Sequence, residues 1–204
     1  MKLYFSPGAC SLASHIVLHE LGLPHEIVRV DTKAKKTADG GDYLKINAKG
    51  YVPALGLDDG GVLTEGPAIL QYLADRKPDA GLAPPNGTMA RYRLQEWLGY
   101  VNSEIHKSFS TFFIPGTADA EKAAAGERLA KKFEWLQATI GDGPYLMGDA
   151  FTVADAYLYT VLNWTGFVGI DLGQWPGLKA FHARIAERPS VQKAHAAEKA
   201  GKSV

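Results

Sequence analysis

The sequence predicts a small α/β domain at the N-terminus, followed by an all-helical domain. Three observations lead to this fold class. Strand and helix patterns alternate over residues 1–80, residues 81–88 are rich in Pro, Gly and Asn, and residues 89–204 carry long helical patterns without strand signals. Alternation followed by helices alone is typical of an α/β layer joined to a helical domain. We therefore predict domains at 1–80 and 89–204, with a linker at 81–88.

The chain opens with a βαβ pattern. Residues 2–5 form a short strand-like run, and residues 11–21 repeat apolar side chains at a spacing of about four, as one face of a helix does. Gly22 and Pro24 end this helix. Residues 25–31 contain Ile27, Val28 and Val30 and predict a second strand, which should lie parallel to the first after a right-handed crossover.

A hairpin and another helix complete the first domain. The turn sequence Asp58-Asp-Gly-Gly61 separates short apolar runs at 53–57 and 62–65, which is a strong hairpin signal. Pro67 opens the helix that follows. The intervening polar stretch contains a short helix around 42–46. Together these elements predict a mixed sheet of about four strands.

The second domain contains helical patterns at residues 89–112, 119–140, 153–167 and 176–199, with breaks. Its strongest local signal is Thr152-Val-Ala-Asp155, preceded by Phe151. A threonine at the N-cap and an acid three residues later satisfy two backbone donors reciprocally. We therefore predict a structural role for Thr152 and Asp155, at the start of a buried helix, and no part in chemistry.

Charge and cysteine content exclude several classes of protein. Lys+Arg and Asp+Glu both number 22, so nothing favours binding to nucleic acid or to an anionic membrane. The only cysteine, Cys10, excludes an intrachain disulfide framework and a CxxC pair. We find no signal region and no segment apolar enough to span a bilayer, which predicts a cytoplasmic protein.

The histidines predict no metal site. The six histidines are scattered along the sequence, and His15 and His19 lie four residues apart on the first helix. No carboxylate completes a site with them, so we interpret them as packed or facing solvent.

Cys10 is the most informative single residue, because it lies where the first strand turns into the first helix. Free N–H groups and the positive end of the helix dipole lower the pKa of a thiol in such a place, and the thiolate is the reactive form. A small buried hydrophobic residue is the alternative interpretation.

Other residues offer groups to a ligand. Glu65 can take an ammonium, the Gly66 N–H at a helix start can take a carboxylate, and Lys35 can take a second carboxylate, although its lysine-rich run also fits a solvated loop. Pro53 suits the start of a strand, and a cis bond before it would present the Val52 backbone to an extended ligand.

One face of the first helix of the second domain combines two polar groups with two aromatic ones. Asn102, His106, Phe109 and Phe113 share this face by their spacing. His106 is interpreted either as a hydrogen-bonded structural histidine or, with Lys107, as the lining of a ligand cleft.

Five motifs in register resemble the bacterial beta-class glutathione S-transferases over essentially the whole chain. These motifs are Tyr4-Phe-Ser-Pro-Gly-Ala-Cys-Ser-Leu-Ala-Ser-His15, Tyr51-Val-Pro-Ala-Leu55, Thr64-Glu-Gly-Pro-Ala-Ile-Leu-Gln-Tyr-Leu73, Ser103-Glu-Ile-His-Lys107 and Phe151-Thr-Val-Ala-Asp-Ala156. The resemblance implies a thioredoxin-like N-terminal domain, an all-α C-terminal domain, a homodimer and glutathione as co-substrate, without a metal.

The resemblance also implies roles for individual residues. Cys10 faces the glutathione sulfur as a catalytic residue, and the catalytic His106 favours a thiolate together with Lys107. Glu65 and the Gly66 N–H hold the γ-glutamyl end of glutathione, and the Val52 backbone pairs with the cysteinyl unit. Lys35 holds the glycyl carboxylate. Ser103 and Glu104 also help to hold glutathione, in part across the dimer interface.

Two positions depart from the family pattern. The family often has serine at the position of Gly66 and asparagine at that of Gly99. Each lost contact is worth about 0.5–1.5 kcal/mol, so we predict weaker glutathione binding than in relatives that have both residues.

The predicted activity is attack of the glutathione thiolate on a hydrophobic electrophile, with Cys10-dependent thiol–disulfide exchange. Phe109, Phe113 and Trp164, with Phe167, are candidates for the electrophile pocket, and plain core packing is the alternative for them. Two other functions remain open: a glutathione-dependent thioltransferase or reductive dehalogenase with little conjugating activity, and a non-catalytic ligand-binding module.

Overall fold

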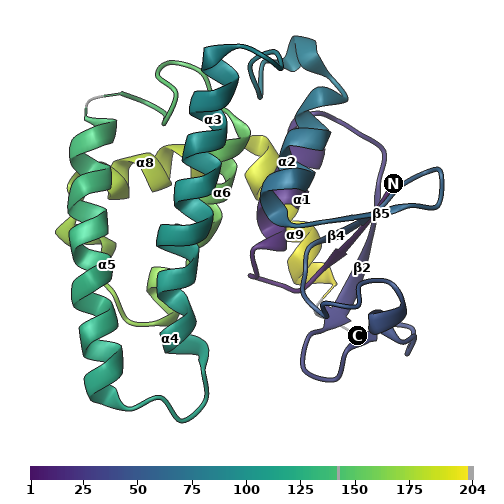
Figure 1. The fold of residues 1–204 in the computed structure, drawn as a ribbon, viewed down its shortest axis with the longest axis horizontal. Helices are drawn as coiled ribbons and strands as arrows, with labels where there is room; N and C mark the ends of the chain where they lie inside the picture. The colour runs from purple at the N-terminus through teal and green to yellow at the C-terminus, as the bar shows by residue number, and fades with distance from the viewer. Residues whose placement is uncertain (142, 202–204) are drawn as a thin grey trace. The chain divides into compact units, whose positions relative to one another are not determined.

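A computed structural model describes residues 1–141 and 143–201 (Figure 1). The chain forms two compact units. One contains Met1–Ala83 and the segment that begins at Glu187, and the other is Pro84–Ala186. This grouping differs from the predicted division at one point, because the last helix belongs with the N-terminal unit and not with the helical domain.

The first unit is built on a mixed sheet with the strand order β3-β2-β1-β4-β5. The β1 and β2 strands pair in parallel, and the other neighbours pair antiparallel. Both the βαβ unit and the hairpin are therefore confirmed. The strands are β1 (Lys2–Phe5), β2 (Glu26–Asp31), β3 (Lys36–Thr37), β4 (Ala54–Gly56) and β5 (Val62–Thr64). The sheet has five strands and not four, because β3 is too short to show a period in the sequence.

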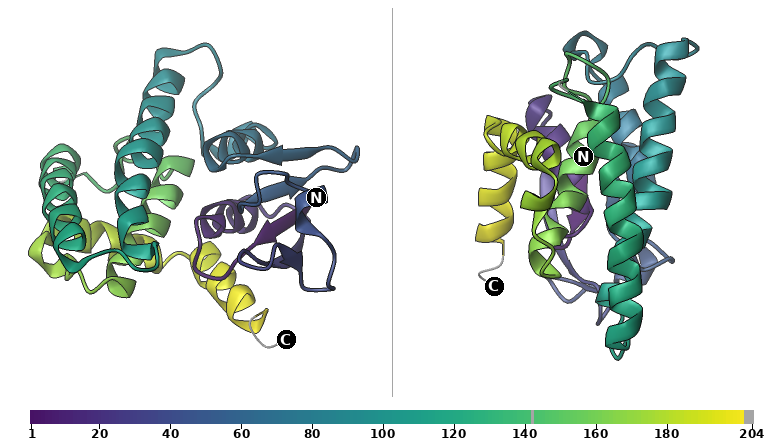
Figure 2. Two further views of the ribbon diagram at one scale, coloured as in Figure 1. Left: turned by 60° about the horizontal axis from the view of Figure 1, so that its bottom comes forward. Right: turned by 90° about the vertical axis from the view of Figure 1, so that its left-hand side faces the viewer.

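The long helices of the first unit pack around α1. Helix α1 contacts both α2 and α9, and Figures 1 and 2 show the yellow α9 beside the purple α1. The left-handed Gly22 ends α1 as predicted, with φ +59°. The helices of this unit are α1 (Ser11–Glu20), the short η1 (Tyr43–Lys45), α2 (Gly66–Asp75), η2 (Pro78–Ala80) and α9 (Pro189–Ala200).

Polar contacts hold the α9 segment to α1. Arg188 and Ser190 both donate to the carboxylate of Glu20. Near the other end of α1, the Gly8 N–H donates to Glu198 Oε2 at 3.0 Å. Helical periodicity predicted this helix, but the contacts that place it join residues more than 160 positions apart.

The second unit consists of helices. They are α3 (Met89–Tyr100), the π-helix η3 (Val101–His106), η4 (Lys107–Phe109), α4 (Ser110–Phe113), α5 (Asp119–Ile140), α6 (Val153–Leu162), α7 (Trp164–Phe167), η5 (Leu172–Gln174) and α8 (Pro176–Ala186). The predicted helix at 89–112 is thus interrupted by η3 and η4, and the one at 153–167 breaks at Asn163. Among the described helices, none combines the length and apolarity that a membrane crossing needs.

The predicted capping box at the start of α6 is present. Thr152 donates to Asp155 Oδ2 from its N–H and from its hydroxyl, each at 2.8 Å. The Leu146 N–H donates to Asp155 Oδ1, also at 2.8 Å. Both Thr152 and Asp155 are buried, so these bonds satisfy donors that solvent does not reach.

Candidate active site

Cys10 lies at the N-cap of α1, after the loop that leaves β1. Its side chain is half-buried, so it is not the fully enclosed hydrophobic residue of the alternative interpretation. The thiol donates to the carbonyl oxygen of Val52 at 3.1 Å. Two of the predicted site residues of the first unit are thereby in direct contact, and the sulfur sits beside the helix start.

Two buried side chains hold the loop that carries Val52 in place. The Tyr43 hydroxyl and the Asn47 amide donate to the Tyr51 carbonyl at 2.7 and 2.8 Å. Burial raises the pKa of Tyr43 to about 12, so this hydroxyl keeps its proton at neutral pH. The Val52–Pro53 bond is cis. Sequence analysis missed Tyr43 and Asn47, although both fall within or beside the predicted helix at 42–46.

Lys35 reaches the same loop from the turn before β3. Its backbone has φ +57°, an uncommon value for a residue with a side chain. Its Nζ donates to the Gly50 carbonyl at 2.8 Å and lies 5.4 Å from the centre of the Tyr51 ring. An ammonium has three donors, so this arrangement orients the charge and leaves capacity for an anion.

Glu65 precedes the first residue of α2 and also has a left-handed backbone, with φ +71°. Its exposed carboxylate accepts from Lys49 Nζ at 2.5 Å, and the same Nζ donates to the Thr64 hydroxyl at 2.8 Å. Sequence analysis expected Glu65 to take an ammonium but did not identify Lys49. At Gly66 an added Cβ would meet no atom within 4 Å, so the missing side chain is not a steric requirement.

His106 is the centre of a polar network within the second unit. Its Nδ1 lies 2.7 Å from the Tyr157 hydroxyl, which donates its own proton to Asn102 Oδ1 at 2.9 Å. The hydroxyl therefore accepts from Nδ1–H, which leaves the lone pair of His106 on Nε2. Burial, with a smaller contribution from Lys107, lowers the pKa of His106 to about 4. At neutral pH the ring is a neutral base, which agrees with the hydrogen-bonded interpretation of this histidine.

The residues that flank His106 are exposed. Ser103, Glu104 and Lys107 all face solvent. Glu104 forms an ion pair with Lys132 at 2.9 Å, and the Lys132 hydrogen bond lowers the pKa of that carboxyl. Lys132 is a second cation that sequence analysis missed, because it comes from α5.

The aromatic candidates surround Trp164. The rings of His106, Phe109 and Phe113 lie 4.7, 5.6 and 5.8 Å from the Trp164 ring, each close to perpendicular. Phe109 is fully buried, which favours core packing for this residue, whereas Phe113 and Phe167 are exposed. A cavity of about 300 Å³ in this unit is lined by residues that include Phe133, Gln174 and Trp175, and by none of the predicted pocket residues.

Comparison with family models covers both units. Residues 8–76 match the N-terminal domain of glutathione S-transferases, and residues 100–189 match their C-terminal domain. The glutathione S-transferase GstA of Escherichia coli is 47% identical over 198 residues, which are 97% of this chain and 98% of that protein. The chain therefore belongs to the glutathione S-transferase family, and it is a transferase.

Solved structures refine this assignment. The beta-class glutathione S-transferase of Sphingomonas chungbukensis is 48% identical with a TM-score of 0.94, over 97% of this chain and 98% of that one. A sphingomonad glutathione S-transferase complexed with glutathione is also 48% identical with a TM-score of 0.95, over 98% and 99% of the two chains. The predicted resemblance to the bacterial beta class and the predicted fold class are confirmed.

Proposed function

We propose that the first unit binds glutathione and that the enzyme activates the glutathione thiol for attack on a hydrophobic electrophile. The observation that carries the proposal is the contact of Cys10 with the Val52 carbonyl, together with the cation of Lys35 bonded to the same loop at Gly50 and the exposed anion of Glu65 at the start of α2. Glutathione has two carboxylates, an ammonium and a thiol. A site with one charge of each sign, helix-start N–H groups and a thiol supplies the complementary groups.

Each group takes a part of the peptide in this proposal. Glu65 accepts from the γ-glutamyl ammonium, and the Gly66 N–H donates to the neighbouring carboxylate. The backbone of Val52 pairs with the cysteinyl unit, as an added strand does. Lys35 takes the glycyl carboxylate. In the second unit, we propose that Ser103, Glu104 and Lys107 contribute to binding and that His106 accepts a proton through Nε2, because its ring is neutral at pH 7.

The half-buried thiol of Cys10 also favours a second activity, thiol–disulfide exchange. The Cys10 thiolate attacks one sulfur of a disulfide, forms a mixed disulfide and releases the other sulfur as a thiolate. A glutathione thiolate then attacks the mixed disulfide and restores Cys10. The electrons balance, because each exchange breaks one S–S bond and forms another.

The test measures conjugation and disulfide reduction side by side on wild type and Cys10→Ala, with glutathione binding measured by calorimetry. Loss of disulfide reduction with retained conjugation assigns Cys10 to exchange alone, and loss of both with retained binding assigns it to both reactions. A wild type that binds no glutathione and has neither activity overturns the proposal in favour of a binding module. A wild type that reduces disulfides or dehalogenates but conjugates nothing favours the reductase alternative.

Family membership also supports a proposal on assembly and location. We propose a homodimer that acts in the cytoplasm on small apolar electrophiles, with domains divided near residues 81–88. Gel filtration with light scattering measures the mass in solution, and a mass of one chain at micromolar concentration contradicts the dimer.

A further inference from the structure

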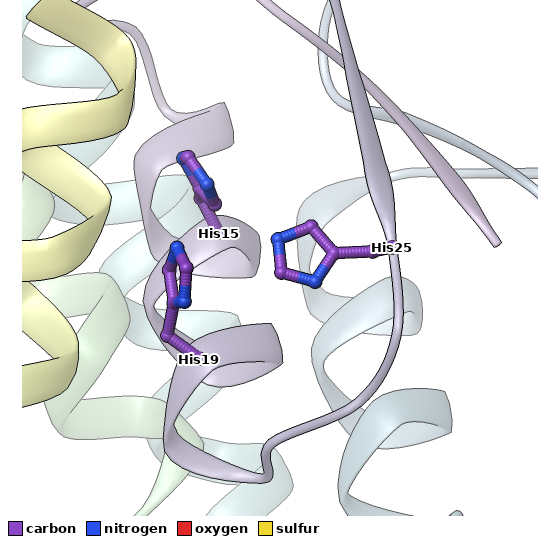
Figure 3. Close-up of side chains that lie close together, drawn as sticks. All are labelled: His15, His19 and His25. Carbon is purple, nitrogen blue, oxygen red and sulfur yellow. The ribbon is translucent and has the colours of Figure 1, made fainter.

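Three histidines come together in the first unit, and none of them is among the residues proposed to bind glutathione. His15 and His19 project from α1, and His25 comes from the segment that leads into β2 (Figure 3). One nitrogen of each ring lies within 4.8 Å of one nitrogen of both others. The ring centres are 4.8, 5.0 and 5.5 Å apart, so the three imidazoles form a single compact group.

Several polar atoms of this group are buried without a hydrogen-bond partner. They are both ring nitrogens of His15, Nε2 of His19 and Oε1 of the neighbouring Glu198, which lies 3.5 Å from His15 Nδ1 without forming a hydrogen bond. His15 is only 1% exposed and the Glu198 side chain only 4% exposed. Unsatisfied buried polar atoms are uncommon and cost free energy, so such a concentration of them calls for an explanation.

Protein oxygens lie behind one ring nitrogen of His25 and one ring nitrogen of His15. His25 Nδ1 lies 2.8 Å from the Leu23 carbonyl, which can only accept, so Nδ1 carries the proton and Nε2 the lone pair. His15 Nδ1 lies 3.5 Å from Glu198 Oε1, while Glu198 Oε2 is held by the Gly8 N–H. A carbonyl or carboxylate behind a ring nitrogen is the outer-shell arrangement of metal-binding histidines.

We propose that His15, His19 and His25 bind one divalent transition-metal ion, preferentially Zn²⁺, with Glu198 and the Leu23 carbonyl as outer-shell acceptors. Three imidazole nitrogens suit zinc and its neighbours, and a fourth position stays open for water. Metal–nitrogen bonds of about 2.0–2.1 Å hold tetrahedral ligands roughly 3.4 Å apart, so the nitrogens need to approach by about 1.4 Å at most.

The carboxylate beside the rings supports this proposal, because Glu198 Oε1 is buried without a hydrogen-bond partner. A bound cation would compensate the buried carboxylate of Glu198. The spacing of His15 and His19 alone did not predict the site, since His25 and Glu198 come from elsewhere in the sequence.

The test titrates Co²⁺ and Zn²⁺ into the untagged full chain carrying Cys10→Ala, which removes the thiol as a competing ligand. Visible absorption reports nitrogen-ligated tetrahedral Co²⁺, and thermal unfolding is measured with and without Zn²⁺. We expect one ion per chain and a higher unfolding temperature with Zn²⁺. His19→Gln and His25→Gln should each lower the Co²⁺ affinity by about 10–100-fold or more, because the loss of an outer-shell partner alone has an effect of that size.

The matched control is His195→Gln, which removes an exposed histidine of α9 and should leave the affinity unchanged. The proposal is overturned if the parent protein binds no ion at one equivalent, or if His19→Gln and His25→Gln bind as tightly as the parent. The cluster is then a group of packed rings without a metal. If one of these variants does not fold, the other decides, and the titration of the parent stands without either.

Discussion

The start of α6 and the start of α2 differ in what their acidic side chains contact. At α6, Asp155 is buried, and its Oδ1 accepts a hydrogen bond from Leu146 while its Oδ2 accepts from Thr152. At α2, Glu65 is exposed, lies in the left-handed region and makes no side-chain bond to the helix start. Its described partner is the side chain of Lys49.

This difference distinguishes an acidic residue that stabilises the fold, Asp155, from one that we propose to bind a ligand, Glu65. The Asp155 carboxylate satisfies donors that would otherwise be buried and unpaired, so its role ends within the fold. The Glu65 carboxylate makes no hydrogen bond to the start of α2 and instead pairs with the exposed Lys49 side chain, which we propose that a ligand ammonium replaces. A residue with an uncommon backbone conformation and an exposed charge is typical of a binding site.

The largest expected effect follows from removing the buried carboxylate. Asp155→Ala orphans the Leu146 N–H and the Thr152 N–H, so the free energy of unfolding should fall by about 3–4 kcal/mol. Urea unfolding measures the change. Glutathione affinity of the folded fraction should stay at the wild-type value. A loss below about 1 kcal/mol would contradict the structural role of the box.

A pH series sharpens the same comparison. Burial raises the pKa of Asp155 from 3.8 to about 6, although hydrogen bonds oppose the shift. A raised pKa in the folded state gives stability at low pH that is lost as the pH rises. The unfolding free energy of wild type relative to Asp155→Asn should therefore fall by about 1–3 kcal/mol between pH 4 and 7. Using the difference cancels the titration of other groups, and a flat difference would refute the shift.

Glu65→Gln tests the other helix start. Its exposed ion pair with Lys49 contributes less than about 1 kcal/mol, so the unfolding free energy should hardly change. Glutathione affinity should fall by about 10-fold or more, because a charged hydrogen bond to the ligand is lost. Differential scanning calorimetry measures the unfolding free energy, and titration calorimetry measures the glutathione affinity of the same preparation. Lys49→Met is the control, since it removes the internal partner and leaves the carboxylate for the ligand.

The smallest effect is expected at Gly66. An added Cβ meets no atom there, so Gly66→Ser places a hydroxyl at the start of α2 without a clash. Glutathione affinity should rise by about 3–10-fold, the equivalent of one neutral hydrogen bond. Gly66→Ala controls for the backbone. An equal gain in both variants would show that the hydroxyl itself makes no contribution.

The sequence predicted what depends on neighbours in the chain. The Thr152–Asp155 box was recognised because its two residues are three positions apart, and the hairpin because Asp58-Asp-Gly-Gly61 favours a turn. Glu65 and Lys35 were predicted as charges, but their partners Lys49 and Gly50 lie 15 or 16 residues away. Local patterns carry no information on such contacts.

The lack of information on distant contacts also explains the largest differences between the predicted and the observed fold. The two-residue β3 exists because β2 offers it a partner, and no periodicity fits in so short a run. The π-helix at Val101–His106 interrupts a segment that reads as regular helix, and it carries His106. Helix α9 was predicted as a helix, but its contacts with α1 arise only when the chain folds back.

The packing of α9 against α1 joins segments that the ribosome synthesises at different times. Glu20 and its partner Arg188 are 168 residues apart, so at about 5–20 residues per second a ribosome delivers them roughly 10–30 s apart. All of the second unit is synthesised within that interval. Until it ends, α1 lacks the packing partner that α9 provides in the folded chain. The first unit is therefore the first to begin translation and the last to be completed.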